Sequence, residues 1–317
     1  MVGQTVSEKE WLIVVNPNAG HEKGKKDWYK ISGLLDRYGI KYVSRFTVMR
    51  RHAIDLTIEG IREGFRKIIA VGGDGTMNEV VNGVFNQTIC PTTHINLGMI
   101  TVGTGNDWGK MFSIPTDYEE AVKIIAAGKS RLQDSGIVTY YHGINRESRY
   151  FINIAGLGFD AVVTRRTNLQ KDKGHKGKTI YFLNLLRSLL FYRHTVTSIA
   201  IDGKIIQGDV FTISIGIGRF SGGGMMQTPN AIPDDGLFDI TVIRKIGKGD
   251  VIMSLKMLYD GTILDHPKIS GYKGKEVLID SDPLIHLEAD GESLGHSPIE
   301  FRIIPKSVNI IYGSFPV

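Results

Sequence analysis

The N-terminal part of the chain alternates short apolar runs with longer segments of helical periodicity, and this alternation restricts the folds open to it. A continuous apolar run is typical of a strand buried on both faces, and such strands joined by helices form a parallel sheet with helices on both sides. The sequence therefore predicts an α/β domain. Its expected strands are residues 12–15, 41–46, 68–71 and 97–101, and its expected helices are residues 26–37, 52–63, 76–85 and 117–127.

After about Gly136 the pattern changes to alternating, strand-like runs separated by Asp-Gly or Gly-rich turns. One segment differs, because its leucines recur at helical spacing and predict a helix with a wide apolar face over residues 179–191. We therefore expect a mainly β domain to follow the α/β domain. Its expected strands lie in residues 198–207, 210–218, 238–244, 277–279, 285–288, 299–304 and 308–312.

Composition excludes several classes of protein. With 42% hydrophobic residues the chain is too apolar to be disordered, and with Cys90 as its one cysteine it forms no internal disulfide. No stretch approaches the ~18 uncharged apolar residues of a membrane-spanning helix, and residues 1–10 lack the apolar core of a secretion signal. We therefore expect a cytoplasmic globular protein. Its net charge of +5 suits an anionic ligand but identifies none.

The most informative segment is Gly72-Gly73-Asp74-Gly75, which joins an apolar strand directly to the start of a helix. Glycine lets backbone N–H groups approach phosphate oxygens, and the positive end of the helix dipole favours an anion. Asp74 adds a carboxylate that can hold Mg²⁺ against those phosphates. A tight strand–helix turn with Asp74 as the helix cap explains the same residues, so this segment alone leaves both interpretations open.

Two further loops favour the phosphate interpretation. Residues 16–20 (Asn-Pro-Asn-Ala-Gly) follow the first strand, and residues 103–107 (Gly-Thr-Gly-Asn-Asp) follow the strand that ends near Thr101. Because the carboxyl ends of parallel strands meet at one edge of a sheet, these loops should gather beside the glycines at 72–75. Three such loops at one edge predict a shared anion site more readily than three unrelated turns.

Together these motifs resemble the catalytic domain of the diacylglycerol kinase family, which includes sphingosine and ceramide kinases and is distantly similar to NAD kinases. The likeness to its bacterial soluble lipid kinases extends over nearly the whole chain. It implies an NAD kinase-like, Rossmann-type nucleotide-binding domain over residues 1–135, a β-sandwich lipid-substrate domain over 136–304, and a C-terminal segment, 305–317, that returns to the first domain. The resemblance further implies that ATP is bound by Asn16, Pro17, Asn18, Ala19, Gly20, Thr47, Gly73, Asp74, Gly75, Thr76, Met77, Asn78, Glu79 and Thr104.

The resemblance also assigns acidic residues. It implies a polar network of Asp74, Asp107 and Asp134 near the Mg²⁺ and phosphates, and a second, structural Mg²⁺ held by Asp235 with the carbonyls of Ile232 and Leu237. Glu292, after Asp290-Gly291, corresponds to the general base that accepts the proton of the attacking hydroxyl, so Glu292 and Asp74 are the expected catalytic residues. Without the resemblance, these segments read as a hairpin turn at Asp235 and a solvated turn at Glu292.

The expected reaction is transfer of the γ-phosphate of ATP, with Mg²⁺, to a lipid hydroxyl. Diacylglycerol giving phosphatidic acid is the first expectation and a sphingoid base or ceramide the second; an NAD kinase-like enzyme and a non-catalytic nucleotide- or lipid-binding protein are the alternatives. The cations between Arg165 and Lys178, beside an apolar helix, suggest peripheral contact with the anionic inner face of a membrane, although a solvated loop explains them equally well. We expect no nucleic-acid partner, and the oligomeric state, a homodimer included, stays open.

Overall fold

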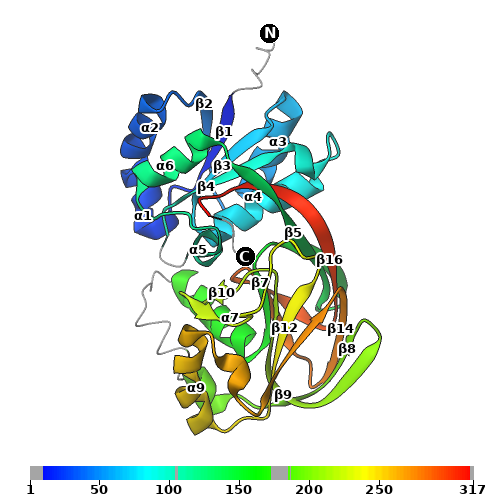
Figure 1. The fold of residues 1–317 in the computed structure, drawn as a ribbon. Coiled ribbons are helices and arrows are strands. Elements are labelled where there is room, and N and C mark those ends of the chain that lie inside the picture. Colours follow the sequence, from blue (N-terminus) through cyan, green and yellow to red (C-terminus); the bar gives the residue numbers. More distant parts are fainter. Residues whose placement is uncertain (1–9, 104–105, 173–184, 186, 315–317) are drawn as a thin grey trace. The chain divides into compact units, whose positions relative to one another are not determined.

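The computed structural model describes residues 10–103, 106–172, 185 and 187–314. The chain divides into two compact units, which are taken in turn below (Figure 1). Unit 1 consists of Met1–Ser135 with Pro305–Val317, and unit 2 of Gly136–Ile304. Strands β5 (Ser130–His142) and β16 (Glu292–Ile311) contribute residues to both units.

Unit 1 is built on a parallel sheet in the order β2–β1–β3–β4, with the end of β16 added beside β4. Each of its first four strands begins and ends within one residue of its expected position, so the α/β prediction is confirmed. Their apolar side chains are almost entirely buried in β1, β3 and β4, as expected for strands covered on both faces. These strands are β1 (Trp11–Val15), β2 (Tyr42–Phe46), β3 (Lys67–Gly72) and β4 (Asn96–Thr101).

Helices cover both faces of this sheet (Figure 1). Helices α2 and α6 pack on the face that carries Ile13 and Val15, whereas Leu12 on the opposite face meets α3. The expected helix over residues 26–37 is wrong at its start, because Asp27 separates two helices. The helices are α1 (Ala19–Lys26), α2 (Trp28–Arg37), α3 (His52–Glu63), α4 (Asp74–Asn86), α5 (Asp107–Met111), α6 (Tyr118–Ala127) and the 3-10 turn η1 (Thr92–His94).

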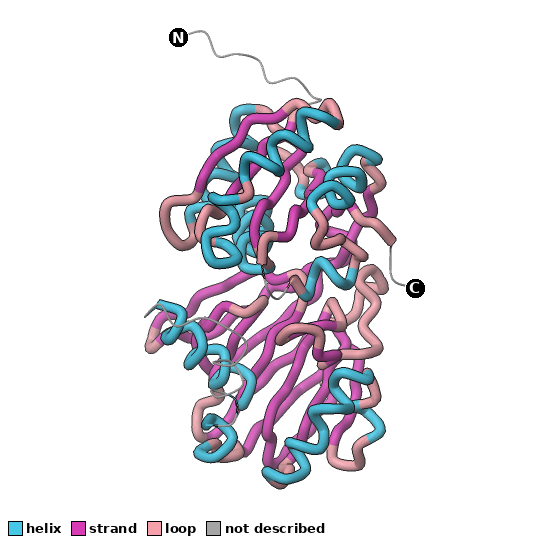
Figure 2. Tube along the Cα trace, turned by 90° about the vertical axis from the view of Figure 1, so that its left-hand side faces the viewer, coloured by secondary structure: helices cyan, strands magenta, loops and turns pink. Residues whose placement is uncertain are grey.

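Unit 2 is mostly strand, and its pairing closes on itself (Figure 2). Strand β9 pairs β8, which pairs β14, and β16, β15 and β7 complete the ring back to β9. The two ends of β9 pair different neighbours, as expected when a long strand turns the corner between the layers of a sandwich. The strands are β6 (Asn145–Phe151), β7 (Ile154–Gly158), β8 (Thr195–Ile201), β9 (Lys204–Gly216), β10 (Phe220–Ser221), β11 (Met225–Met226), β12 (Phe238–Arg244), β13 (Ile269–Gly274), β14 (Glu276–Asp282), β15 (His286–Ala289) and β16.

The mainly β prediction is confirmed, with two corrections. The two expected strands over 299–304 and 308–312 are one strand, β16, which continues through Pro305 and Lys306 although Lys306 has a positive φ of 48°. Helices α7 (Phe159–Asp172) and α9 (Lys248–Asp260), and the 3-10 turn η2 (Ile263–Asp265), were not expected. Residues 179–184 and 186 of the expected apolar helix lie outside the described residues; its remainder is helical and buries Leu185 and Leu189.

Candidate active site

The loops after β1, β3 and β4 converge at the carboxyl edge of the unit 1 sheet. Gly20, in the β1 loop, has a φ of +59°, and a Cβ there would collide with the backbone carbonyl oxygen of Val102 at the end of β4. A Cβ at Gly103 would lie 3.3 Å from the Cα of Gly73 in the β3 loop. The three loops therefore pack backbone against backbone, and at Gly20 only glycine permits this approach.

Side chains join the same loops. The Asn16 side-chain amide donates to the Thr76 hydroxyl over 3.0 Å, which links the β1 loop to the first turn of α4. The Asn18 backbone N–H donates to the Asn16 side-chain oxygen over 3.1 Å and fixes the turn between them. Thr47 follows β2 at the same edge, where its N–H donates to the Val15 carbonyl and its side chain is buried. The structure thus brings together several of the expected nucleotide-binding residues, from the loops after three strands.

The start of α4 is left open by the chain itself. Gly73 precedes the helix, and the nearest atom to a Cβ built there would be the Asn106 side-chain oxygen, 4.0 Å away. Asn106 is buried, and that oxygen has no hydrogen-bond partner among the described residues. A helix N-terminus with a glycine that internal packing does not require fits a bound phosphate group, and the Asn106 oxygen beside it is an acceptor that suits a cation or a hydroxyl donor.

Asp74 caps a neighbouring helix rather than its own. Its carboxylate accepts hydrogen bonds from the backbone N–H groups of Asp107, at 2.8 Å, and Trp108, at 3.3 Å, at the start of α5. One Asp107 oxygen lies 3.4 Å from the Lys110 ammonium. Asp74 and Asp107 therefore lie together at the meeting point of the β3 and β4 loops, where oxygen ligands for Mg²⁺ would be needed.

Other expected site residues have structural partners. The Glu79 carboxylate accepts from the backbone N–H groups of Arg51 and Ala53, at 2.9 and 3.1 Å, and so caps α3. Asp134 is fully buried and accepts from the Lys306 amide at 2.7 Å, in the segment that returns from unit 2. Met77 and Asn78 are buried within α4, and Thr104 lies outside the described residues.

In unit 2, Glu292 begins β16 directly after a tight turn. Ala289 pairs with Glu292 across the hairpin, and Asp290 and Gly291 form the turn with positive φ angles of 48° and 82°. The buried Asp290 carboxylate accepts three backbone N–H groups, from residues 152–154, at 3.0 to 3.2 Å. Asp290 therefore anchors the turn, and the Glu292 side chain that follows it is exposed.

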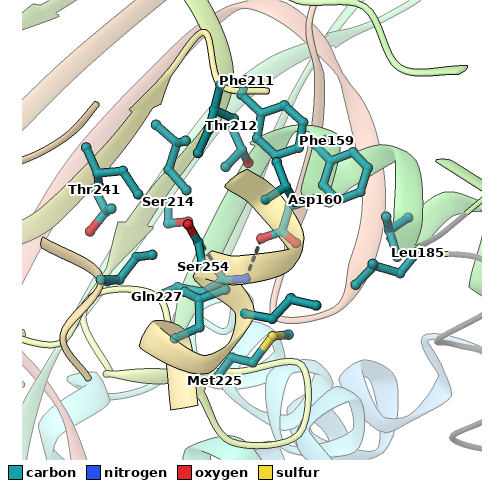
Figure 3. Close-up of a pocket in the computed structure, with 18 residues that line it drawn as sticks. Phe159, Asp160, Leu185, Phe211, Thr212, Ser214, Met225, Gln227, Thr241 and Ser254 are labelled. Atoms are coloured by element: carbon teal, nitrogen blue, oxygen red, sulfur yellow. Dashed lines mark hydrogen bonds between the residues drawn. The ribbon is translucent and has the colours of Figure 1, made fainter. Parts of the chain in front are cut away.

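A cavity in unit 2 was not anticipated from the sequence. It contains about 700 Å³ of space, counted out into the solvent at its mouth. Most of its lining is apolar and comes from α7, α9, β9 and β12, with a few polar groups that include Asp160 and Gln227 (Figure 3). Its residues are scattered along the chain, so no local motif marks it.

Two acids near this cavity were also missed. The half-buried Asp160 is the second residue of α7 and the buried Glu288 lies in β15, and burial raises the pKa of both carboxyl groups, that of Glu288 to well above its usual range. The negative charge of the nearby Asp160 raises the pKa of Glu288 further. A glutamate between Leu287 and Ala289 in an apolar strand was the one sequence signal that marked this pair.

The expected second metal site contains a competing cation. One Asp235 oxygen accepts the Leu237 amide at 3.0 Å, and the other lies 3.0 Å from the Lys273 ammonium. Asp239 is buried close by, with one oxygen that has no partner among the described residues, and burial raises its pKa to about 6. An orphaned carboxylate oxygen beside a second carboxylate fits a divalent cation, provided that Lys273 gives way.

Comparisons with known proteins identify both units. The diacylglycerol kinase catalytic domain family matches residues 10–138, and the YegS C-terminal NAD kinase beta sandwich-like domain family matches residues 153–312. Diacylglycerol kinases of Staphylococcus carnosus and Bacillus subtilis are each 30% identical, over 95% and 96% of this chain and 94% and 96% of theirs. The crystal structure of a putative diacylglycerol kinase from Bacillus anthracis superposes with a TM-score of 0.78 at 27% identity, covering 96% of this chain and 95% of that one.

Proposed function

Since this chain belongs to the diacylglycerol kinase family and is a lipid kinase, we propose that it transfers the γ-phosphate of ATP, with Mg²⁺, to the hydroxyl of diacylglycerol. The observation that carries the nucleotide part of the proposal is the convergence of three loops on the open start of α4 at Gly73. The cavity of unit 2 supports a lipid acceptor, because its lining is mostly apolar. A diacylglycerol acceptor also agrees with the relatives' names.

In this mechanism unit 1 positions the donor. The backbone of the residue 16–20 and 73–75 loops would hold the phosphates, and Asp74 with Asp107 would hold Mg²⁺, which neutralises charge that builds up on the transferred group. Asp74 is already oriented by two backbone N–H groups, so its carboxylate does not have to reorganise when the ion arrives.

Unit 2 supplies the acceptor side of the reaction. Glu292 would take the proton of the lipid hydroxyl as the hydroxyl oxygen bonds to the γ-phosphorus, and the bond from that phosphorus to the bridging oxygen of ADP breaks. The hairpin turn fixes the backbone of Glu292 through Asp290, whose carboxylate accepts three backbone N–H groups. Peripheral contact with a membrane stays a prediction, because Lys173, Lys176 and Lys178 lie outside the described residues.

A panel of acceptors tests the proposal. ADP release should be measured with diacylglycerol, ceramide, sphingosine and NAD, each at the same concentration and each lipid in the same detergent micelles. We expect diacylglycerol to give the highest kcat/KM. A higher value for ceramide or sphingosine would replace the acceptor and keep the lipid kinase, whereas a higher value for NAD would overturn the lipid proposal.

If the cavity holds an acyl chain of the lipid, filling it should weaken the binding of long-chain substrates. Ser254 lines the cavity, and its buried hydroxyl has no partner among the described residues. Replacing Ser254 by Phe should fill the space, raise the KM for long-chain diacylglycerol at least ten-fold, and leave the KM for ATP unchanged. Ser254→Ala, which keeps the space, is the matched control. Equal KM values for the two variants with long-chain substrate would place the acyl chain elsewhere.

The second metal site can be tested by the effect of Mg²⁺ on thermal stability in the absence of nucleotide. Millimolar Mg²⁺ should raise the Tm of the wild type by several degrees if Asp239 helps to hold an ion in the folded state. In Asp239→Asn this rise should disappear. Asp209→Asn, which removes a different carboxylate of unit 2, one paired with Lys245 at 3.3 Å, should keep it. An undiminished Mg²⁺ response in Asp239→Asn would exclude this residue as a ligand.

A further inference from the structure

The buried Glu288 and the half-buried Asp160 form a pair of carboxyl groups to which the mechanism above gives no role. A Cβ at Gly156 would lie 2.7 Å from a Glu288 oxygen and 3.1 Å from an Asp160 oxygen, so both groups turn toward the same point on β7. Glu288 lies beside Gly156 in the sheet, and Asp160 is the second residue of the helix that follows β7. Only glycine at 156 leaves room for both carboxyl groups.

One side of the pair faces the cavity. The Gln227 side-chain amide donates to Asp160 over 2.6 Å, and the Ser214 hydroxyl donates to Gln227 over 3.2 Å (Figure 3). These three residues line the cavity together with the hydroxyls of Thr241 and Ser254, which are buried and have no partner among the described residues. Asp160 thus belongs to a polar strip in an otherwise apolar wall, and the two unpartnered hydroxyls indicate that a ligand completes this strip.

The other side of the pair holds the turn before Glu292. The second Glu288 oxygen accepts the Gly291 N–H at 2.8 Å. The Gly291 carbonyl in turn accepts from the Asn168 side chain at 3.0 Å, and Asn168 lies on the same helix, α7, as Asp160. The residue that precedes Glu292 is therefore fixed at both its N–H and its carbonyl by groups connected to the cavity wall.

The ionisable groups that act on Glu288 are acidic, whereas the cation Arg165 of α7 acts on His286, two residues earlier in β15. Asp160, Asp290 and Glu292 are the ionisable groups that raise the pKa of Glu288, and the Gly291 amide is the one group that lowers it. Two ionised carboxylates buried together would repel each other strongly, whereas one proton between them removes a charge and supplies a donor. Each carboxyl group accepts one hydrogen bond, but Glu288 is the more deeply buried of the two, so Glu288 is the group that holds the proton.

We propose that Asp160 and Glu288 share one proton and act together as positioning residues that hold the turn at Gly291, and with it Glu292, against the wall of the lipid cavity. This inference rests on the proposed function of Glu292 as the proton acceptor. It adds a link from α7 and the cavity to the catalytic hairpin. Neither residue touches the transferred phosphoryl group in this role.

Glu288→Ala and Glu288→Gln test the proposal together. Alanine removes the acceptor of the Gly291 N–H, so kcat should fall about 100-fold while the KM values for ATP and lipid change little. Glutamine keeps an oxygen for Gly291 and an N–H for Asp160, so kcat near neutral pH should return close to the wild-type value. Glu276→Ala, at an exposed glutamate of the same unit, is the control and should behave as wild type.

The pH profile supplies the readout that a purely structural role would not change. As the pH rises and the pair loses its proton, the two carboxylates repel and wild-type kcat should fall; Glu288→Gln cannot titrate and should lose this alkaline limb. The wild-type free energy of unfolding should also fall as the pH rises above about 4.3, since the folded state retains a proton that the unfolded state releases. This slope should be smaller in Glu288→Gln.

Three results would overturn the proposal: full kcat in Glu288→Ala, failure of glutamine to restore kcat in a folded protein, or the same alkaline limb in Glu288→Gln as in wild type. Diacylglycerol kinase activity of the wild type, measured alongside, separates this outcome from failure of the proposed function. An inactive wild type would contradict the proposed function itself. An active wild type with any of the three results would contradict only the proposed role of Asp160 and Glu288.

Discussion

Replacing Glu292 by Gln should lower kcat for lipid phosphorylation by a factor of about 10² to 10⁴, the usual contribution of a positioned general base. The glutamine side chain has nearly the same shape and is exposed, so folding should be unaffected. Because Glu292 belongs to unit 2 and the residues expected to hold phosphate belong to unit 1, the affinity for ATP should stay close to that of the wild type. Steady-state kinetics and nucleotide titration measure the two effects separately.

Glu276→Gln is the matched control for this variant, since it removes another exposed carboxylate from the same unit. It should retain wild-type kcat. If Glu292→Gln were as active as Glu276→Gln, Glu292 would not be the proton acceptor and another group would have to be found.

Replacing Gly73 by Ala should raise the KM for ATP at least ten-fold, about 1.4 kcal/mol of lost binding, with little loss of stability. A Cβ at this position meets no protein atom closer than 4.0 Å, and the backbone φ of −102° suits alanine. The added methyl group therefore costs the folded chain little but occupies the space in front of the α4 N–H groups. Isothermal titration with ATP measures the loss of binding, and thermal melting measures the stability of the fold.

Gly33→Ala is the control, because a Cβ at that glycine of α2 also meets nothing within 4 Å and lies away from the loops. Its KM for ATP should be unchanged. An unchanged KM in Gly73→Ala as well would mean that phosphate does not bind at the start of α4.

The strands and most helices of unit 1 could be predicted because local patterns determine them. Buried parallel strands such as β1 and β3 are continuous apolar runs, and the repeat of strand and helix specifies the sheet. The motif loops were expected at one edge for the same reason, and the packing of Gly103 on Gly73 confirms that they meet.

The features that could not be predicted from the sequence depend on contacts between residues far apart in the chain. The local sequence allows Asp74 to cap its own helix, but its carboxylate caps α5, more than thirty positions away. Pro305 and Lys306 resemble a turn, yet β16 continues through them because both sides of the strand find partners, β14 before them and β4 after them. The cavity and the Asp160–Glu288 pair form from several elements, so no local pattern predicts them.

The central claim is that this chain moves the γ-phosphate of ATP to diacylglycerol with Glu292 as the proton acceptor. The most direct measurement incubates wild type and Glu292→Gln with γ-³²P-labelled ATP, Mg²⁺ and diacylglycerol in mixed micelles, and follows the label in the lipid fraction. The account predicts labelled phosphatidic acid from the wild type and almost none from Glu292→Gln. No label in lipid from the wild type, or equal label from both proteins, would contradict it.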